Sequence, residues 1–209
     1  MSASDAADHI LEAAESAVDE KFRSRVAFAI ALMAMLLAIA SLGGGNAAED
    51  MLGNNIEASD AWAFYQAKNV RQTAYRLAAD ELETELRVRQ DSLTPEARQE
   101  LQRRLDQYKE TVERYESEPD PKEPGDPLKG EGKKELSARA RNFQEQRDRA
   151  MRQDPNFDYS EALFQIAIVL ASVAILITSR PILWLSLAMA AVAFVLMLNG
   201  FLLFFTLPF

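Results

Sequence analysis

The last 48 residues of the chain, 162–209, contain a single charged side chain, Arg180. Arg180 lies in a Ser-Arg-Pro break between two apolar stretches of 17 and 26 residues. About 20 consecutive apolar residues cross the ~30 Å hydrocarbon core of a bilayer as a helix. The sequence therefore predicts a transmembrane hairpin, with one span at residues 161–179 and another at residues 182–207.

A third uncharged run of 17 residues, Val26–Leu42, lies near the N-terminus. It could be the apolar core of a cleaved signal peptide, because basic residues precede it and small residues follow it. However, the 25-residue lead before it contains six acidic residues, and the run is longer than the ~7–15 residues usual for such a core. We therefore expect an uncleaved anchor at residues 26–43 and three spans in all.

The charge and residue-type balance excludes several functions. The net charge is -9 and there is no cysteine, so the chain has no basic footprint for nucleic acid and no thiolate for a disulfide or a metal site. The carboxylates lie mainly on polar helix faces, not in a dry pocket where catalytic groups are tuned. The single histidine, His9, lies on one such acidic face, which we interpret as solvated. We expect no enzyme activity, no cofactor and no metal.

Basic residues near the spans predict the orientation. Three of them precede the first span: Lys21, Arg23 and Arg25. Residues 43–62, which follow that span, contain no lysine or arginine, and Arg180 is the only charge between the last two spans. The positive-inside rule places the N-terminus in the cytoplasm. Residues 44–160 then lie outside, in the periplasm of a Gram-negative inner membrane.

The polar residues are expected to form helices. Residues 1–25 read as an acidic amphipathic helix with one apolar stripe: Ile10, Ala14, Val18 and Phe22. A helix without glycine or proline is expected from Ile56 to about Gln90. Thr94 and Pro95 then provide a helix cap and a first-turn proline for a helix ending near Glu116.

Four prolines and three glycines at residues 117–132 predict an irregular loop, after which a third helix begins near Lys133. The two helices around this loop carry heptad-like seams, the first at Leu101, Leu105, Tyr108, Val112 and Tyr115, the second at Leu136, Ala140, Phe143, Arg147 and Ala150. The simplest arrangement is an antiparallel pair joined at the loop, with the Ile56 helix beside it. Because such narrow seams bury little apolar area, self-association is expected.

The predicted fold class is therefore an all-α membrane protein with three transmembrane helices, an extramembrane helical or coiled-coil bundle and an oligomeric state. Inside the membrane, the first span carries small residues at steps of 4 and 3: Ala27, Ala31, Ala34, Ala38 and Ser41. Small residues allow helices to approach closely in lipid. Asn199 in the third span is interpreted as an interhelical hydrogen-bond partner.

Residues 57–72 read EASDAWAFYQAKNVRQ. This segment resembles the E-A-x-x-x-W-x-x-Y-Q-A-K stretch of a bacterial family called domain of unknown function 4337. The order of segments is also similar, from an acidic lead and one span to a charged helical region and a closing apolar hairpin with Asn-Gly in its last span. The resemblance implies a bacterial inner-membrane protein and implies no activity.

Aromatic and polar side chains are interleaved in this segment, and the candidate contact residues are Trp62, Tyr65, Gln66, Lys68, Asn69 and Arg71. They would meet partners across a bundle or line a vestibule. We predict a non-enzymatic protein that contacts membrane lipid and assembles with its own copies or with a larger membrane complex. The alternative is a channel or transport subunit with its vestibule near residues 62–72.

Overall fold

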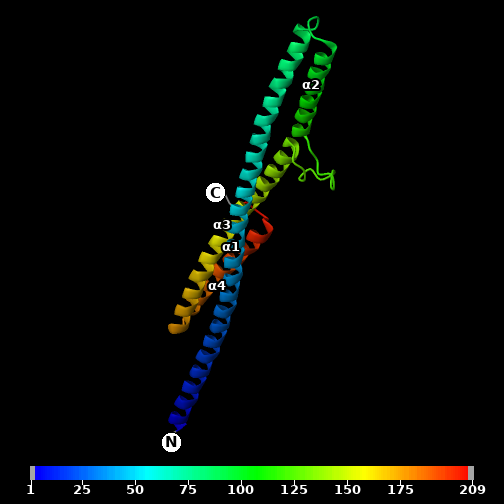
Figure 1. Cartoon of the computed structure of the whole chain (residues 1–209). Helices are drawn as coiled ribbons and strands as arrows, with labels where there is room; N and C mark the ends of the chain where they lie inside the picture. The colour runs from blue at the N-terminus through cyan, green and yellow to red at the C-terminus, as the bar shows by residue number, and fades with distance from the viewer. Residues whose placement is uncertain (1–2, 207–209) are drawn as a thin grey trace. The chain divides into compact units, whose positions relative to one another are not determined.

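The computed structural model describes residues 3–206, with side chains described from residue 20 onward. It contains four helices, α1 (Ala3–Val88), α2 (Pro95–Glu116), α3 (Lys133–Leu176) and α4 (Arg180–Leu202) (Figure 1). Between residues 3 and 206 there is no strand, and the one isolated bridge pairs Pro119 with Gly130. The side-chain predictions for the acidic lead before residue 20, including His9, lie outside the described side chains.

Three of the helices, α1, α3 and α4, are long and apolar enough to cross a membrane. The all-helical prediction and the three span-capable segments are therefore confirmed. The chain divides into two compact units. We call residues 1–50 with 149–209 the membrane unit, because it contains the three apolar runs, and residues 51–148 the polar unit.

The predicted start of α2 is confirmed. Thr94 is its N-cap, and the Thr94 side chain accepts a hydrogen bond from the backbone nitrogen of Ala97. Pro95 occupies the first turn, where a missing N–H costs nothing. α3 begins at Lys133, also as expected.

α1 differs from the prediction because no separate helix begins at Ile56. The helix is continuous from Ala3 to Val88 and passes through three consecutive glycines, Gly43 to Gly45. Glycine weakens a helix interior by only about 1 kcal/mol relative to alanine. One of these glycines, Gly43, packs against an aromatic ring, as described below, so the absence of a side chain is required there without a break in the helix.

α4 ends before the predicted end of the third span at residue 207. Its last residue is Leu202, and Leu203 adopts a left-handed backbone with φ of 51°. The Asn199 side chain accepts a hydrogen bond from the backbone nitrogen of Phe205 and donates one to its carbonyl oxygen, each at 3.0 Å. These two bonds hold the residues after α4 in a turn, which the apolar composition of the segment did not indicate.

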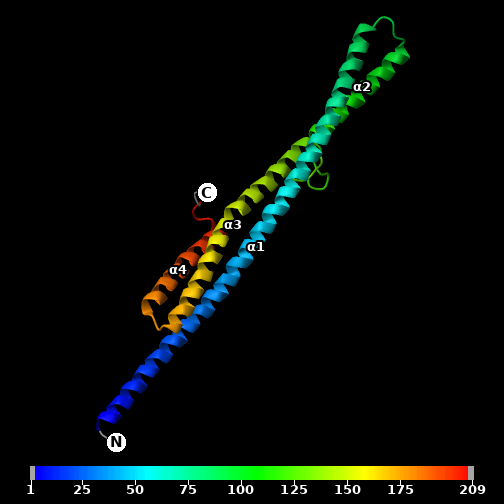
Figure 2. The ribbon, with the colours of Figure 1, turned by 90° about the vertical axis from the view of Figure 1, so that its left-hand side faces the viewer.

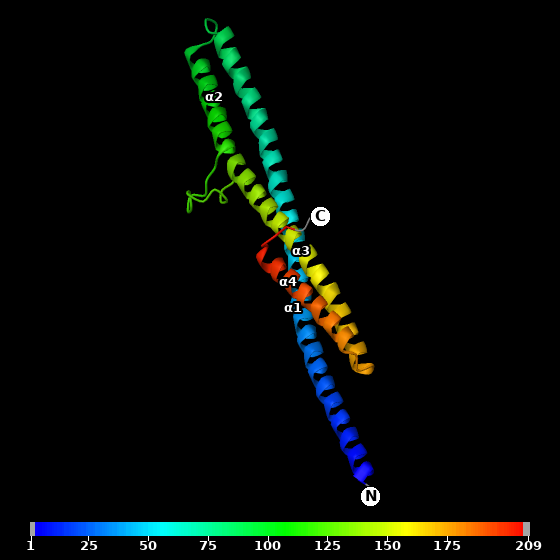
Figure 3. The same cartoon turned by 180° about the vertical axis from the view of Figure 1, so that it is seen from behind.

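In the polar unit, the predicted antiparallel pairing of α2 with α3 is wrong. α2 runs antiparallel to α1, with Lys109 3.6 Å from Glu83 and Tyr108 packed on Tyr75 (Figure 1). The start of α3 continues in the same direction as α2 (Figure 3). Its Arg147 therefore reaches Asn55, near the beginning of the α1 segment in this unit.

α3 continues in the direction of α2 because the 117–132 loop leaves the helical bundle and returns to it at the same place. The bridge between Pro119 and Gly130 closes the base of the loop, and the Glu131 backbone nitrogen donates to the Glu118 carbonyl oxygen at 2.9 Å. Gly130 has a φ of +117°, which favours glycine. The loop is consequently a side excursion between two helices that both line α1.

In the membrane unit, α3 and α4 form the expected hairpin (Figure 2). Small residues allow their close approach: Ala167, Ala171, Ala174 and Ala193 are fully buried. Two hydroxyls cross the hairpin, with Ser160 donating to the Ala193 carbonyl oxygen at 2.8 Å and Ser186 to that of Ala167 at 2.6 Å. The α1 face that packs in this unit repeats every seven residues at Val26, Met33, Ala40 and Ala47.

Candidate functional site

The segment of α1 in the polar unit has one face that packs against α2 and α3. We call it the inward seam, and its residues follow steps of 3 and 4: Ala58, Ala61, Tyr65, Lys68, Gln72, Tyr75 and Ala79. All of them are buried or half-buried. This heptad pattern was missed in the sequence because lysine and glutamine occupy two of its central positions.

Gln72 is the centre of the inward seam and is only 2% exposed. Its amide nitrogen donates to the Val112 carbonyl oxygen at 2.9 Å and to the Glu116 carboxylate at 3.0 Å. Its amide oxygen accepts from the Lys133 ammonium at 2.8 Å. One side chain of α1 therefore joins the end of α2 to the start of α3.

Two lysines lie close to Gln72, Lys68 on the inward seam and Lys133 at the start of α3. Lys68 is 3.0 Å from the Glu118 carboxylate, and its ammonium lies 5.6 Å from the centre of the Tyr115 ring. Lys133 is 3.3 Å from Glu116 and 5.5 Å from the centre of the Tyr65 ring. The predicted contact residues Tyr65 and Lys68 are thus engaged within the unit.

Carboxylates complete this polar cluster. The hydrogen bonds from Gln72 and Lys133 lower the pKa of Glu116. Burial on its own raises the pKa of Glu135, but hydrogen bonds from the Ser117 hydroxyl and the Glu118 backbone nitrogen outweigh it, and the pKa is lowered. Both carboxylates therefore carry a negative charge at neutral pH.

The buried polar groups of the cluster are all paired. Within the described side chains, every buried side-chain nitrogen and oxygen has a hydrogen-bond partner. Buried polar groups that are fully paired rigidify a structure and specify one packing arrangement. We interpret the cluster as the set of interactions that fixes how α1, α2 and α3 pack in the polar unit.

The other predicted contact residues of α1 lie outside the inward seam. Gln66, Asn69 and Arg71 are exposed, and Trp62 is half-buried with its ring 5.4 Å from that of Tyr65. The structure therefore divides the predicted set into two faces. Gln66, Asn69 and Arg71 are the most exposed residues of the set.

In the membrane unit, the predicted packing residues also separate. Four alanines of α1, which we call the alanine strip, are all exposed: Ala27, Ala31, Ala34 and Ala38. Asn199 is fully buried and donates to the Asn156 side chain at 2.7 Å, across α3 and α4. The basic residues used to predict the orientation, Lys21, Arg23, Arg25 and Arg180, are exposed.

Phe157 of α3 is a packing residue that was not predicted. It is 2% exposed, and its ring meets that of Phe201 at 4.8 Å. A β-carbon at Gly43 would lie 2.5 Å from the Phe157 ring, and one at Gly200 would lie 2.7 Å from it. Glycines on α1 and α4 therefore form the socket for this ring. The only sign of this socket in the sequence is the presence of glycines in apolar helices.

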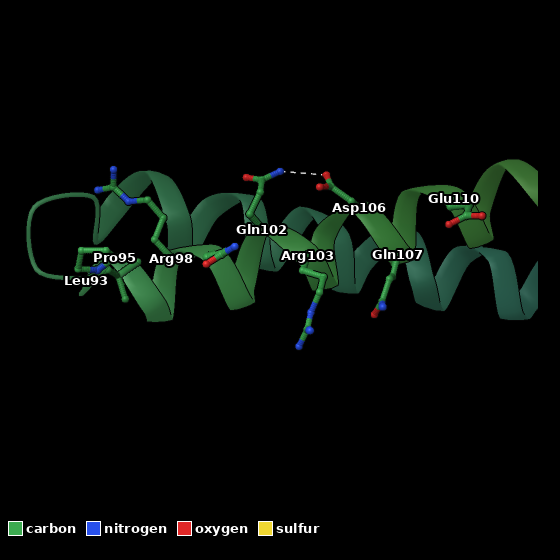
Figure 4. A pocket seen from close by; sticks show the side chains of 9 residues that line it. Leu93, Pro95, Arg98, Gln102, Arg103, Asp106, Gln107 and Glu110 are labelled. Atoms are coloured by element: carbon green, nitrogen blue, oxygen red, sulfur yellow. Dashed lines mark hydrogen bonds between the residues drawn. The ribbon is translucent and has the colours of Figure 1, made fainter.

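A surface groove with a volume of about 850 Å³ lies along α2 (Figure 4). It is lined by one helix and the turn before it, from Leu93 and Pro95 to Glu110, and Gln102 donates to Asp106 at 2.9 Å. No second element brings catalytic groups toward it. Among the described residues, no cluster of three or more His, Asp or Glu side chains could hold a metal ion.

Comparison with known proteins gives one match. The family model described as Domain of unknown function (DUF4337) matches residues 22–203. Searches of curated proteins and of solved structures each found no match. The matched range includes all three span-capable runs and the whole polar unit.

Proposed function

Because the chain belongs to the family described as Domain of unknown function (DUF4337), a description that names no activity, we propose a function from its own surfaces. We propose a non-catalytic membrane protein that assembles with copies of itself, alone or within a larger membrane complex. In this proposal the three spans anchor the protein in the lipid and α1 provides the contacts between copies.

One observation carries the proposal: the alanine strip is left unused by the protomer. Small residues on α3 and α4 pack against neighbouring helices of the same chain, with Ala167, Ala171 and Ala193 fully buried. By contrast, Ala34 and Ala38 of α1 are exposed. A strip of small residues facing only lipid gains nothing there, because lipid tails pack as well against larger side chains.

The strip suits a second helix in lipid. Transmembrane helices associate by close packing, and small residues at steps of 4 and 3 allow two backbones to approach. Anchoring in one membrane also raises the effective concentration of the copies relative to one another. Self-assembly through α1 is therefore the simplest use of this surface.

We further propose that the N-terminus is cytoplasmic and that the polar unit lies on the outer side of a bacterial inner membrane. Lys21, Arg23 and Arg25 on one side of the first span support this orientation, as does Arg180 in the turn of the hairpin. A topology reporter inserted at Gly125, in the exposed loop, should be active only outside the cytoplasm. Activity of the reporter only inside the cytoplasm would reverse the orientation.

Energy transfer between copies in liposomes tests the assembly. A single cysteine at Gly125, where an added side chain meets nothing within 4 Å, carries the donor or acceptor dye. We expect transfer above the level of random encounters, and a loss of at least half of that excess for Ala34→Leu. Ala191→Leu is the matched control, because Ala191 is an exposed alanine on α4, and should leave transfer unchanged. Transfer at the random level for the wild-type protein would exclude the proposal.

A further inference from the structure

The face of α1 opposite the inward seam carries a row of exposed apolar side chains in the polar unit. We call it the outward strip: Leu52, Ile56, Ala63, Val70 and Leu77. The last four are seven residues apart, which is the repeat of a coiled coil. The exposed fractions are large for such side chains, at 52% for Ile56, 69% for Val70 and 64% for Leu77.

The chain itself does not cover this strip. α2 and the beginning of α3 lie along one side of α1 (Figure 3), and they contact it through Gln72 and Tyr75. Residues two apart in a helix point about 200° from each other, so Val70 faces away from Gln72. A continuous row of exposed apolar residues on a charged, water-facing helix indicates an interaction site.

We propose that the outward strip pairs, in parallel and in register, with the same strip of a second copy of this chain. The inference rests on the proposed self-assembly and names the surface and the geometry used outside the membrane. Copies anchored in the same membrane with one orientation present α1 in the same direction. A parallel pairing in register then brings Ala63, Val70 and Leu77 against their own equivalents.

The polar side chains beside the strip fit this arrangement. In a parallel coiled coil, the flanking residue at position i meets the residue at i+5 of the partner helix. Here Gln66 meets Arg71 of the second copy, an amide oxygen opposite a guanidinium, and both side chains are exposed. No like charges oppose each other at that point.

The composition of the strip also favours close pairing. Ala63 lies in the repeat, and Ala67 and Ala74 lie beside it at steps of 3 and 4, so the two backbones can approach along the middle of the strip. The same register contains Asp60 before Ala63 and Glu81 after Leu77. Identical carboxylates facing each other repel, which limits the close contact to the segment from Ala63 to Leu77.

Single cysteines test this geometry, because the chain has none of its own. In native membranes under mild oxidation, Ala63→Cys, Val70→Cys and Leu77→Cys should form disulfide-linked dimers. Asn69→Cys and Arg76→Cys are the matched controls, since both positions are exposed on other sides of α1. A disulfide needs β-carbons about 3.5–4.5 Å apart, so we expect at least tenfold more dimer at the strip positions than at the controls.

A yield of disulfide-linked dimer with no seven-residue periodicity, or a dimer yield that is highest at the control positions, would overturn the inference. Cross-linking to a different protein would overturn the choice of a second copy as the partner. Energy transfer in liposomes distinguishes a failure of this interface from a failure of self-assembly. High transfer without strip cross-links would contradict only this interface, whereas transfer at the random level would contradict self-assembly itself.

Val70→Asp should reduce the Ala63→Cys dimer at least tenfold while the inward seam stays folded, as Trp62 fluorescence would report.

Discussion

Replacing Gln72 with alanine is expected to lower the free energy of unfolding of the polar unit by about 2–4 kcal/mol. Three hydrogen bonds end on this buried side chain. Its removal leaves the Lys133 ammonium, which is 12% exposed, with the Glu116 carboxylate at 3.3 Å and the Tyr65 ring at 5.5 Å. It also leaves a cavity where α1, α2 and α3 meet, because the surrounding helices cannot fully collapse.

Denaturant unfolding of the full chain in detergent measures this effect. The chain has two tryptophans, Trp62 in the polar unit and Trp184 in α4, so a Trp184→Phe background makes fluorescence report the polar unit alone. Gln66→Ala is the matched control, since Gln66 is on the same helix and exposed, and it should change stability by no more than about 0.5 kcal/mol. Equal effects of the two substitutions would show that the polar cluster does not hold the unit together.

Replacing Gly43 with valine is expected to destabilise the membrane unit by about 2–3 kcal/mol, the upper part of the usual range for overpacking. The new β-carbon would lie 2.5 Å from the Phe157 ring. The ring cannot retreat, because Gly200 and Phe201 of α4 pack on it. The clash therefore has to separate α1 from α3 or force the ring out of its socket.

Gly45→Val is the control for helix propensity, because a β-carbon at Gly45 meets nothing within 4 Å. We expect it to change stability by no more than about 0.5 kcal/mol. A Trp62→Phe background lets Trp184 report the membrane unit. Combining Gly43→Val with Phe157→Leu should cost at least about 1 kcal/mol less than the sum of the two single changes, because neighbouring residues couple. Strict additivity would mean that the two residues do not meet.

Local features of the fold and the α3–α4 hairpin were predictable from the sequence, whereas the pairing of helices in the polar unit was not. The ends of α2 follow from Thr94, Pro95 and the first proline of the loop, whose effects are confined to a few residues. The direction of α3 depends on whether the 117–132 loop reverses the chain, and that is set by one bridge between Pro119 and Gly130. A proline-rich composition predicts an irregular loop but not the direction in which the chain leaves it.

The candidate surfaces were predictable only in part, for a similar reason. The alanine strip follows from its spacing, but the sequence does not say which face of α1 the other helices cover. The inward seam was missed because the sequence alone suggests that Lys68 and Gln72 are solvated. They become core residues only through partners 40 or more positions away. The Phe157 socket likewise joins residues from three separate helices.

The mass of the protein in lipid nanodiscs, measured by native mass spectrometry, tests the central claim most directly. Self-assembly predicts complexes whose protein mass is a whole multiple, two or more, of the 23.4 kDa chain. A species of 23.4 kDa alone, under conditions that preserve bound lipid, would contradict it.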